Sequence, residues 1–347
     1  MNRLKQVSFP SRILSRHVGG NTTYAREIAK GLELRGVEVS QMGSSQRAAI
    51  TALMETWQGL TVPAKPGFVL HYSADTGPLL PTRAPSVVTV HGVASRWITT
   101  ARSARQEKIW RTRVQRAIHS TDAVITVSRS SADDVSEVFG IDPALITTIP
   151  HGIDTEYFAQ RRVLSERLQH LRSVPYVLYL GNIEPRKNLI ELVRAFSLPP
   201  LKDLGVKLVI AGKPAWNAAE TMAAIESAGI EHLGFVDDDE RVALMQHAAL
   251  FAFPSLYEGF GFPVLEALAS GTAVICSDRG SLKEVAGPSL VFEDTDAESI
   301  ARGIAGAFSN STATRHSEDA GLAWARRFSW DASVEAHTAV YEKVLQR

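Results

Sequence analysis

Short apolar runs, each followed by a glycine-containing loop and a helical pattern, recur along this chain and restrict its fold more than any other feature. Residues 4–9 form the first run, and residues 22–35 then place apolar side chains at helical spacing. The same order begins again with the apolar run at residues 176–180. Strands that alternate with helices are typical of a parallel sheet covered by helices. The sequence therefore predicts an α/β protein built from two doubly wound domains.

Length and charge both divide the chain into two parts. Its 347 residues suit two domains of about 150 residues each, which we place at residues 1–155 and 174–329 with a hinge between them. Cutting the chain after Ser173 leaves 22 Lys and Arg against 14 Asp and Glu before the cut, and 15 against 23 after it. The parts carry charges of +8 and −8, which predicts attraction between them across a cleft and an anionic partner for the first part.

The cysteine count and the hydropathy pattern bear on the compartment. Cys276 is the single cysteine and follows an apolar run, so we expect a buried thiol in a reducing environment. The sequence contains no run of 18 apolar residues and no evident signal peptide. These features predict a cytoplasmic protein.

The stretch F-P-S-L-Y-E-G-F-G-F-P-V-L-E-A-L-A-S-G, at residues 253–271, predicts a ligand site. Gly259 and Gly261 allow a tight turn, and Pro263 suits the first turn of a helix that begins near Gly261 or Phe262. The unpaired N–H groups of such a helix start favour a phosphate.

Two carboxylates, Glu258 and Glu266, frame that helix start. Taken singly, each is more simply explained as a complement to the helix dipole. Together with the free amides they offer acceptors for hydroxyl groups beside donors for an anion. A sugar nucleotide carries both kinds of group.

The two glutamates lie eight positions apart around G-F-G-F-P, and this string resembles the E-x7-E signature of the family-four retaining glycosyltransferases. E-P-R-K-N at residues 184–188 and H-G-I-D at residues 151–154 match other motifs of that family. The resemblance covers essentially the whole chain. It implies the GT-B architecture, with two Rossmann-like domains facing a central cleft and a last helix, at about residues 330–347, that crosses back to the N-terminal domain. It also implies a nucleotide-diphosphate sugar as co-substrate, with no other cofactor and no catalytic metal.

Arg186 and Lys187 are adjacent cations at the start of a predicted helix, where the dipole disfavours positive charge. The conflict predicts a compensating anion, although basic pairs in general are mostly solvated on the surface. Arg and Lys together can neutralise a diphosphate leaving group. The resemblance implies the same role for this pair.

The resemblance further assigns the donor contacts. It implies that Glu258 hydrogen-bonds the sugar near its anomeric carbon and that Glu266 binds the ribose hydroxyls. The positions that it assigns to the donor through backbone groups are Gly19, Gly20, Phe235, Val236, Gly259, Phe260, Gly261 and Val264. The acids at residues 237–239 are better explained as a helix cap than as a contact to the base.

His91 ends the apolar run at residues 86–90 and is followed by a glycine. Open α/β sheets bind ligands at the carboxyl ends of their strands, although a structural histidine in a loop fits this position equally well. The resemblance implies that His91 orients the donor sugar. His71 is the second choice, and His151 and Asp154 are expected to be structural.

The most basic segment of the chain precedes residue 120. At helical spacing, its apolar residues gather on one face, and four arginines fall on another: Arg102, Arg105, Arg113 and Arg116. The simpler interpretation is a solvated helix face. The alternative is contact with an anionic membrane surface or a pyrophosphate-linked acceptor. A nucleic-acid partner is disfavoured because no aromatic interleaving or binding module accompanies the charge.

Together with these patterns, the resemblance implies a retaining, metal-independent glycosyltransferase that moves a hexose from a nucleotide-diphosphate sugar to a glycan or lipid-linked acceptor. GDP-mannose is the first choice of donor, and the expected location is cytoplasmic, peripheral at the inner face of the membrane. The alternatives are a GT-B sugar-nucleotide epimerase and a non-catalytic carbohydrate-binding scaffold. A Rossmann oxidoreductase is disfavoured because G-F-G-F-P-V lacks the third glycine of the dinucleotide-binding motif.

Overall fold

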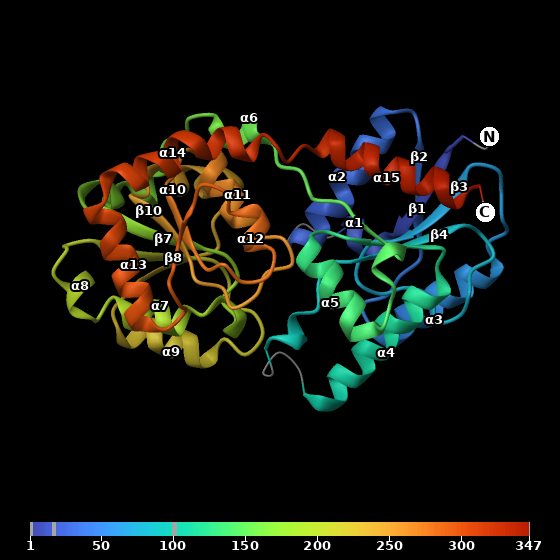
Figure 1. Ribbon diagram of the computed structural model, residues 1–347, viewed down its shortest axis with the longest axis horizontal. Coiled ribbons are helices and arrows are strands. Elements are labelled where there is room, and N and C mark those ends of the chain that lie inside the picture. The colour runs from blue at the N-terminus through green and yellow to red at the C-terminus, as the bar shows by residue number, and fades with distance from the viewer. Residues whose placement is uncertain (1–2, 16–18, 99–102, 347) are drawn as a thin grey trace. The chain divides into compact units, whose positions relative to one another are not determined.

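The computed structural model describes residues 3–15, 19–98 and 103–346 and contains two compact α/β units (Figure 1). The first unit runs up to Arg96, from Ser103 to Gly152 and from Phe328 onward. The second runs from Ile153 to Arg327, with Trp97 and Ile98 also assigned to it. The boundary in the middle of the chain therefore falls directly after Gly152.

The first unit is built on a parallel six-stranded sheet with the order β2-β1-β3-β4-β5-β6. Its strands are β1 (Gln6–Pro10), β2 (Glu38–Met42), β3 (Phe68–Tyr72), β4 (Ser86–Val90), β5 (Ala123–Thr126) and β6 (Ile146–Thr148). Every residue of β3 and β4 is buried, as expected for strands covered on both faces. The strand order reverses between β1 and β3, and such reversals are where open α/β sheets bind ligands.

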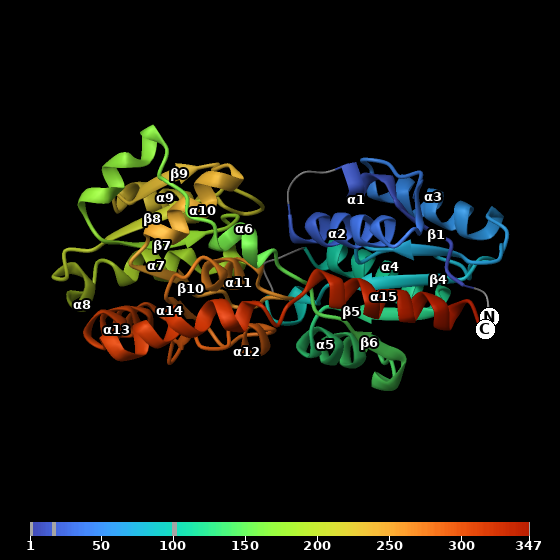
Figure 2. The same cartoon turned by 90° about the horizontal axis from the view of Figure 1, so that it is seen from above.

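The helical segments of the first unit are α1 (Ser11–Ser15), α2 (Gly20–Leu34), α3 (Ala48–Thr61), η1 (Ala94–Arg96), α4 (Ala104–Ser120), α5 (Arg129–Phe139), η2 (Pro143–Leu145) and α15 (Trp330–Val344). Helix α1 lies where the sequence predicted a loop. Helices α2 and α15 lie side by side in both views (Figures 1 and 2). Gly31 permits this approach, because a Cβ atom there would lie 2.4 Å from Val334. The last helix therefore returns to the N-terminal unit, as predicted.

A buried cluster of histidine and tyrosine side chains joins α15 to this sheet. The Tyr24 hydroxyl lies 2.8 Å from His337 Nε2, and the Tyr341 hydroxyl lies 2.7 Å from His71 Nδ1. His71 Nε2 also contacts Thr89 at 2.8 Å. Burial lowers the pKa of His337 to about 4 and lowers that of His71 well below its usual value. His71 is thus a neutral core residue, and its interpretation as a second-choice site residue is wrong.

The second unit is built on another parallel six-stranded sheet, with the order β12-β11-β10-β7-β8-β9. Its strands are β7 (Tyr176–Leu180), β8 (Lys207–Ala211), β9 (Glu231–Gly234), β10 (Leu250–Phe253), β11 (Val274–Cys276) and β12 (Leu290–Val291). The strand order reverses between β7 and β10. The two doubly wound sheets confirm the predicted fold class.

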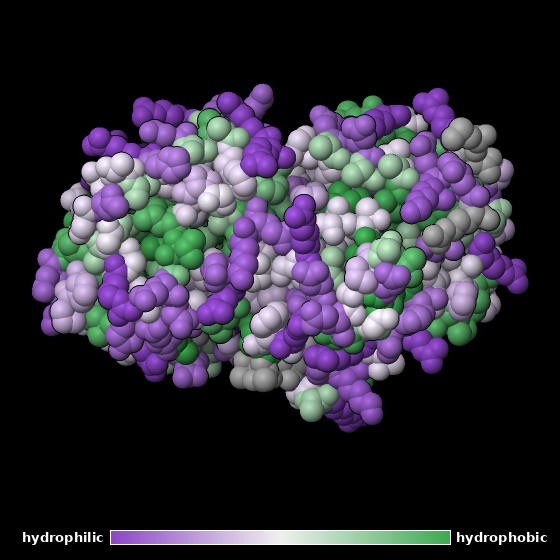
Figure 3. Space-filling model, in the orientation of Figure 1, coloured by the Kyte–Doolittle hydropathy of each residue, from purple (hydrophilic) through white to green (hydrophobic). Residues whose placement is uncertain are grey.

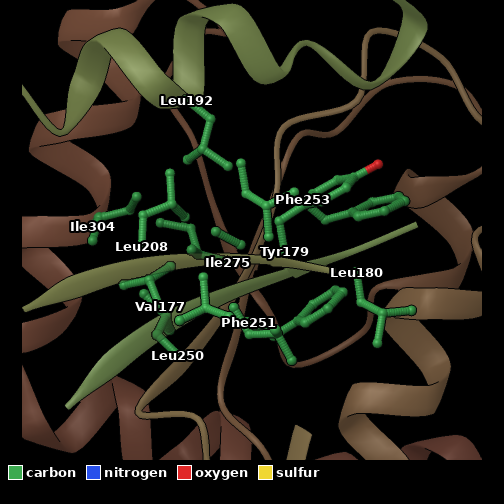
Figure 4. Packing of buried hydrophobic residues seen from close by; sticks show 14 of the residues in the cluster. Val177, Tyr179, Leu180, Leu192, Leu208, Leu250, Phe251, Phe253, Ile275 and Ile304 are labelled. Atoms are coloured by element: carbon green, nitrogen blue, oxygen red, sulfur yellow. The ribbon is translucent and has the colours of Figure 1, made fainter. Parts of the chain in front are cut away.

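The helical segments of the second unit are α6 (Thr155–Ala159), η3 (Glu166–Ser173), η4 (Pro185–Lys187), α7 (Leu189–Ala195), α8 (Pro199–Lys202), α9 (Ala219–Ser227), α10 (Asp238–His247), α11 (Phe262–Ala269), α12 (Leu282–Val285), α13 (Ala297–Ser309) and α14 (Ser311–Ala325). Figure 4 shows strand side chains meeting Leu192 of α7 and Ile304 of α13 in the core. Tyr179 and Phe253 stack at 5.9 Å. Cys276 is a buried free thiol in β11, as predicted.

Residues 153–173 pack within the second unit. Leu164, Leu168 and Leu171 belong to its buried core, and Arg162 pairs with Asp239 of α10 at 3.0 Å. These contacts hold the segment against the sheet on which the candidate site is built.

Candidate active site

The loops that follow β7 and β10 meet where the strand order of the second sheet reverses. The β7 loop carries Glu184, Arg186 and Lys187, and the β10 loop carries Tyr257 and Glu258. Neighbouring parallel strands end at the same edge of the sheet, so side chains far apart in the sequence converge there.

Four charged side chains form one ionic cluster at this edge. Arg186 Nη1 lies 2.7 Å from Glu258 Oε2, and Arg186 Nη2 donates to Glu184 Oε1 at 2.6 Å. Arg186 Nη1 also donates to the Tyr257 carbonyl at 2.8 Å. Lys187 Nζ donates to Glu258 Oε1 at 2.6 Å. Glu258 therefore accepts from both cations at once.

Burial and mutual attraction fix the charge states of this cluster. Burial alone would raise the pKa of Glu258, but Arg186 and Lys187 lower it to about 2. For Lys187, burial and the nearby Arg186 lower the pKa despite the attraction of Glu258. Burial opposes the charge of Arg186 as well, but Glu258 and Glu184 outweigh it and raise the pKa. The site therefore holds an ionised carboxylate between cations.

The local backbone differs from the prediction at this pair. Arg186 and Lys187 lie in the short 3₁₀ turn η4, and Asn188, with φ of 59°, separates that turn from α7. The pair therefore precedes the α-helix, and the prediction that it opposes the helix dipole is wrong. Within the structure Glu184 and Glu258 compensate the two cations.

The glycine-rich turn has the predicted form. Gly261 caps α11 with φ of 99°, and the helix begins at Phe262 with Pro263 in its first turn. The assigned backbone positions Gly259, Phe260 and Val264 belong to this turn and the start of α11. Gly280, which the sequence analysis missed, lets a second loop approach, because a Cβ atom there would lie 2.5 Å from the Glu258 carbonyl oxygen.

Glu266 lies buried in the second turn of α11. Arg241 of α10 donates to Glu266 Oε1 at 3.0 Å. Burial raises the pKa of Glu266, and Arg241 opposes that effect. Arg241 was not predicted as a site residue because no local sequence pattern links α10 to α11.

Phe235 and Val236 follow β9 at the same edge of the second sheet. Phe235 is 57% exposed, and Lys213 Nζ lies 4.1 Å from the centroid of its ring. Asp237 accepts from the backbone N–H of Glu240 at 2.8 Å and caps α10, as predicted. The Phe235 carbonyl accepts from Arg167 Nη2 at 3.3 Å, and the exposed aromatic side chain suits a planar ligand.

His91, Gly19 and Gly20 belong to the first unit. The His91 backbone N–H donates to Asp75 at 2.6 Å, and its Nε2 donates to the Ser73 carbonyl at 3.1 Å. Gly19 caps α2 with φ of 108°, and Gly20 begins that helix. The roles assigned to these three residues stay predictions.

Helix α4 corrects the prediction of one basic face. Arg105 and Arg116 are exposed, but the Arg113 side chain is only 17% exposed and lies 3.9 Å from the buried Glu55 of α3. Arg113 therefore does not belong to an exposed basic face. Arg102 lies outside the described residues.

No helix among the described residues is long and apolar enough to cross a membrane. On the face shown in Figure 3, hydrophobic residues form small groups among hydrophilic ones.

No group of three or more His, Cys, Asp and Glu side chains in the described ranges is arranged to hold a metal ion.

Comparison with known proteins identifies both parts of the chain. Residues 65–157 match the family described as "Glycosyltransferase Family 4", and residues 161–321 match "Glycosyl transferases group 1". The chain is similar to the O-antigen chain mannosyltransferase B of Escherichia coli, with 31% identity over 62% of this chain and 59% of that protein. It is also similar to an MMP alpha-(1->4)-mannosyltransferase of Mycolicibacterium hassiacum, with 28% identity over 67% and 57%. The match therefore spans less than two thirds of these relatives.

Solved structures share the fold at low identity. Sucrose-phosphate synthase from Thermosynechococcus elongatus superposes with a TM-score of 0.79 at 17% identity, covering 99% of each chain. WaaG, a glycosyltransferase involved in lipopolysaccharide biosynthesis, superposes with a TM-score of 0.73 at 15% identity, covering 97% of this chain and 99% of that one. The two family matches and the paired doubly wound sheets show that the chain belongs to the family-four glycosyltransferases and has the GT-B fold.

Proposed function

We propose that this protein transfers a hexose from a nucleotide-diphosphate sugar to a glycan or lipid-linked acceptor with retention of configuration, and that the donor is GDP-mannose. The observation that carries the proposal is the cluster of Arg186, Lys187 and Glu258 beside the start of α11. The mannosyltransferase names of the similar proteins support the choice of sugar.

The cluster supplies the charges that departure of a diphosphate requires. Arg186 and Lys187 offer several N–H donors, and the positive end of the α11 dipole lies beside them. Positive groups fixed in advance stabilise the negative charge that develops on the leaving oxygen, without reorganisation during the reaction. No bound metal is needed for this step.

Glu258 acts as a hydrogen-bond acceptor rather than as a general acid. Its pKa of about 2 keeps the carboxylate ionised at neutral pH, so it can bind a sugar hydroxyl and offset positive charge at the anomeric carbon. The acceptor then attacks the face from which the phosphate leaves, and the leaving phosphate takes the acceptor's proton. Catalysis consists of positioning and charge stabilisation.

The remaining contacts orient the donor. Glu266, held by Arg241, binds the ribose hydroxyls, and the exposed Phe235 lies beside the base. His91 contributes from the first unit through Nδ1, because its Nε2 already donates to Ser73.

Incubation with GDP-mannose and lipid-linked glycans tests the proposal. The expected result is GDP release that depends on the acceptor, a product with the α-configuration by NMR, and an unchanged rate in EDTA. Donor turnover without an acceptor would instead indicate an epimerase. Sugar binding without GDP release would indicate a carbohydrate-binding scaffold.

We further propose that the protein acts at the inner face of a membrane, where α3 and α4 contact anionic lipid. Arg105 and Arg116 are exposed on α4, and Leu53 and Trp57 of α3 are 67% and 68% exposed. Each basic residue near such a surface contributes about 1 kcal/mol.

The double variant R105Q/R116Q is therefore expected to bind vesicles of mixed phosphatidylglycerol and phosphatidylcholine about 10- to 30-fold more weakly than the native protein in co-sedimentation. The matched control R315Q changes an exposed arginine of α14 in the second unit and is expected to bind as the native protein does. Equal vesicle binding by all three proteins would contradict the proposal that this surface contacts anionic lipid.

A further inference from the structure

A cavity of about 380 Å³ opens where the strand order of the first sheet reverses. Helices α1, α2, α3 and α4 line it together with the loops after β2 and β3. Its lining includes Pro10, Gly19, Ser44, Thr51, Glu55 and Arg113. Its size falls within the range of small-molecule sites, about 300–1,000 Å³.

Two charged side chains in this cavity each have a buried atom without a hydrogen bond among the described residues. Glu55 is 2% exposed, and its Oε2 has no hydrogen-bond partner in the described part of the chain. Arg113 Nε likewise has none among the described residues. Arg113 Nη2 lies 3.9 Å from Glu55 Oε2, which is close enough for attraction but too long for a hydrogen bond.

Thr51 and Ser44 of the lining are satisfied within the fold. Thr51 Oγ1 donates to the Ser45 carbonyl at 2.8 Å, and Ser44 Oγ accepts from the Arg12 backbone N–H at 2.7 Å. An unsatisfied buried group costs about 1–3 kcal/mol, and more when it is charged. Two of the unmet hydrogen bonds of the lining are thus found at Glu55 Oε2 and Arg113 Nε, and a second cation, Arg12, lines the same cavity.

The distance between the Glu55 and Arg113 side chains indicates which kind of ligand group can hydrogen-bond to both. An oxygen about 2.8 Å from both Glu55 Oε2 and Arg113 Nη2 fits the 3.9 Å separation. A hydroxyl satisfies both, because it donates to the carboxylate and accepts from the guanidinium. An ionised phosphate oxygen cannot donate to the carboxylate, and an ammonium group cannot accept from Arg113.

We propose that Glu55 and Arg113 bind a neutral, hydroxyl-rich group in this cavity and that the group is a sugar ring of the acceptor. The assignment to the acceptor rests on the proposed function. The cavity includes Gly19 and Gly20 in its lining, so the sugar ring would lie beside the start of α2.

Neutral methyl glycosides test the proposal without any donor. Methyl α-D-mannopyranoside, α-D-glucopyranoside and α-D-galactopyranoside are titrated into the full chain and followed by saturation-transfer NMR. At least one is expected to bind the native protein, and the isosteric variant E55Q and the variant R113Q are each expected to weaken that binding at least fivefold. The control E33Q changes an exposed acid of α2 and is expected to bind as the native protein does.

Circular dichroism melting of each variant separates loss of binding from loss of folding, and E55Q preserves the side-chain volume. Inorganic phosphate is the competing probe, because burial raises the pKa of Glu55 to about 7 and a protonated Glu55 can donate to an anion. Phosphate binding that excludes the glycosides would overturn the proposal. So would the absence of glycoside binding, or equal binding by folded E55Q and the native protein.

The results of this test and of the test of the proposed function distinguish failure of one proposal from failure of the other. If glycosides bind in a Glu55-dependent way but the protein releases no GDP, the sugar site in the cavity is supported and the transferase proposal is contradicted. Acceptor-dependent GDP release that is unaffected in E55Q would do the reverse.

Discussion

Replacing Lys187 with methionine is expected to lower the rate of GDP release from GDP-mannose by about 100- to 1,000-fold, the usual effect of removing one preorganised donor to a developing negative charge. Methionine keeps the apolar stem beside Phe253, whose ring centroid lies 4.7 Å from Lys187 Nζ, and removes only the ammonium group. Steady-state kinetics with a saturating acceptor measures the effect.

The same substitution is expected to cost some stability as well. Lys187 is buried and donates to Glu258 at 2.6 Å, and a hydrogen bond between charged groups contributes about 1.5–3 kcal/mol. Melting curves therefore accompany the kinetics. The control K202M removes an exposed lysine of α8 and is expected to leave both quantities unchanged. A folded K187M within threefold of the native rate would contradict the role of Lys187.

Replacing Glu258 with glutamine is expected to lower the free energy of unfolding of the second unit by about 3–5 kcal/mol at pH 7, because it leaves buried cations without their shared carboxylate. Glu258 has a pKa of about 2 in the folded unit against 4.5 as a free side chain. Its stabilising effect is therefore fully present above pH 4.5 and is lost as the pH falls toward 2. Urea unfolding at several pH values measures the effect, and the difference between the native protein and E258Q should narrow on acidification.

A surface pair provides the matched control for that experiment. Glu191 pairs with Arg194 at 2.6 Å, but the Arg194 side chain is 63% exposed, so E191Q is expected to cost less than about 1 kcal/mol. If E258Q were as stable as E191Q at pH 7, the cluster would not have the energetic role described here.

Local patterns in the sequence predict the fold and much of the candidate site. Periodicity and glycine placement are encoded by near neighbours, so β7, the start of α11 and the cap at Asp237 lie where they are expected. The E-x7-E string is equally local, and it places Glu258 and Glu266 around one helix start.

Contacts between distant segments could not be predicted in this way. Arg241 reaches Glu266 from another helix, and Arg113 turns toward Glu55 rather than toward solvent. Both contacts depend on which helices pack together in the folded protein. His71 resembles a ligand residue by its place at the end of a strand, but Tyr341, 270 positions along the chain, makes it part of the core. Such partners have no signature in a local pattern.

A calorimetric titration with GDP and with guanosine tests the central claim, that the loops after β7 and β10 bind a diphosphate. The account predicts that GDP binds the native protein at least tenfold more tightly than guanosine does, and that K187M loses most of this difference. Equal affinity for GDP and guanosine, or a preference for GDP that is unchanged in K187M, would contradict it.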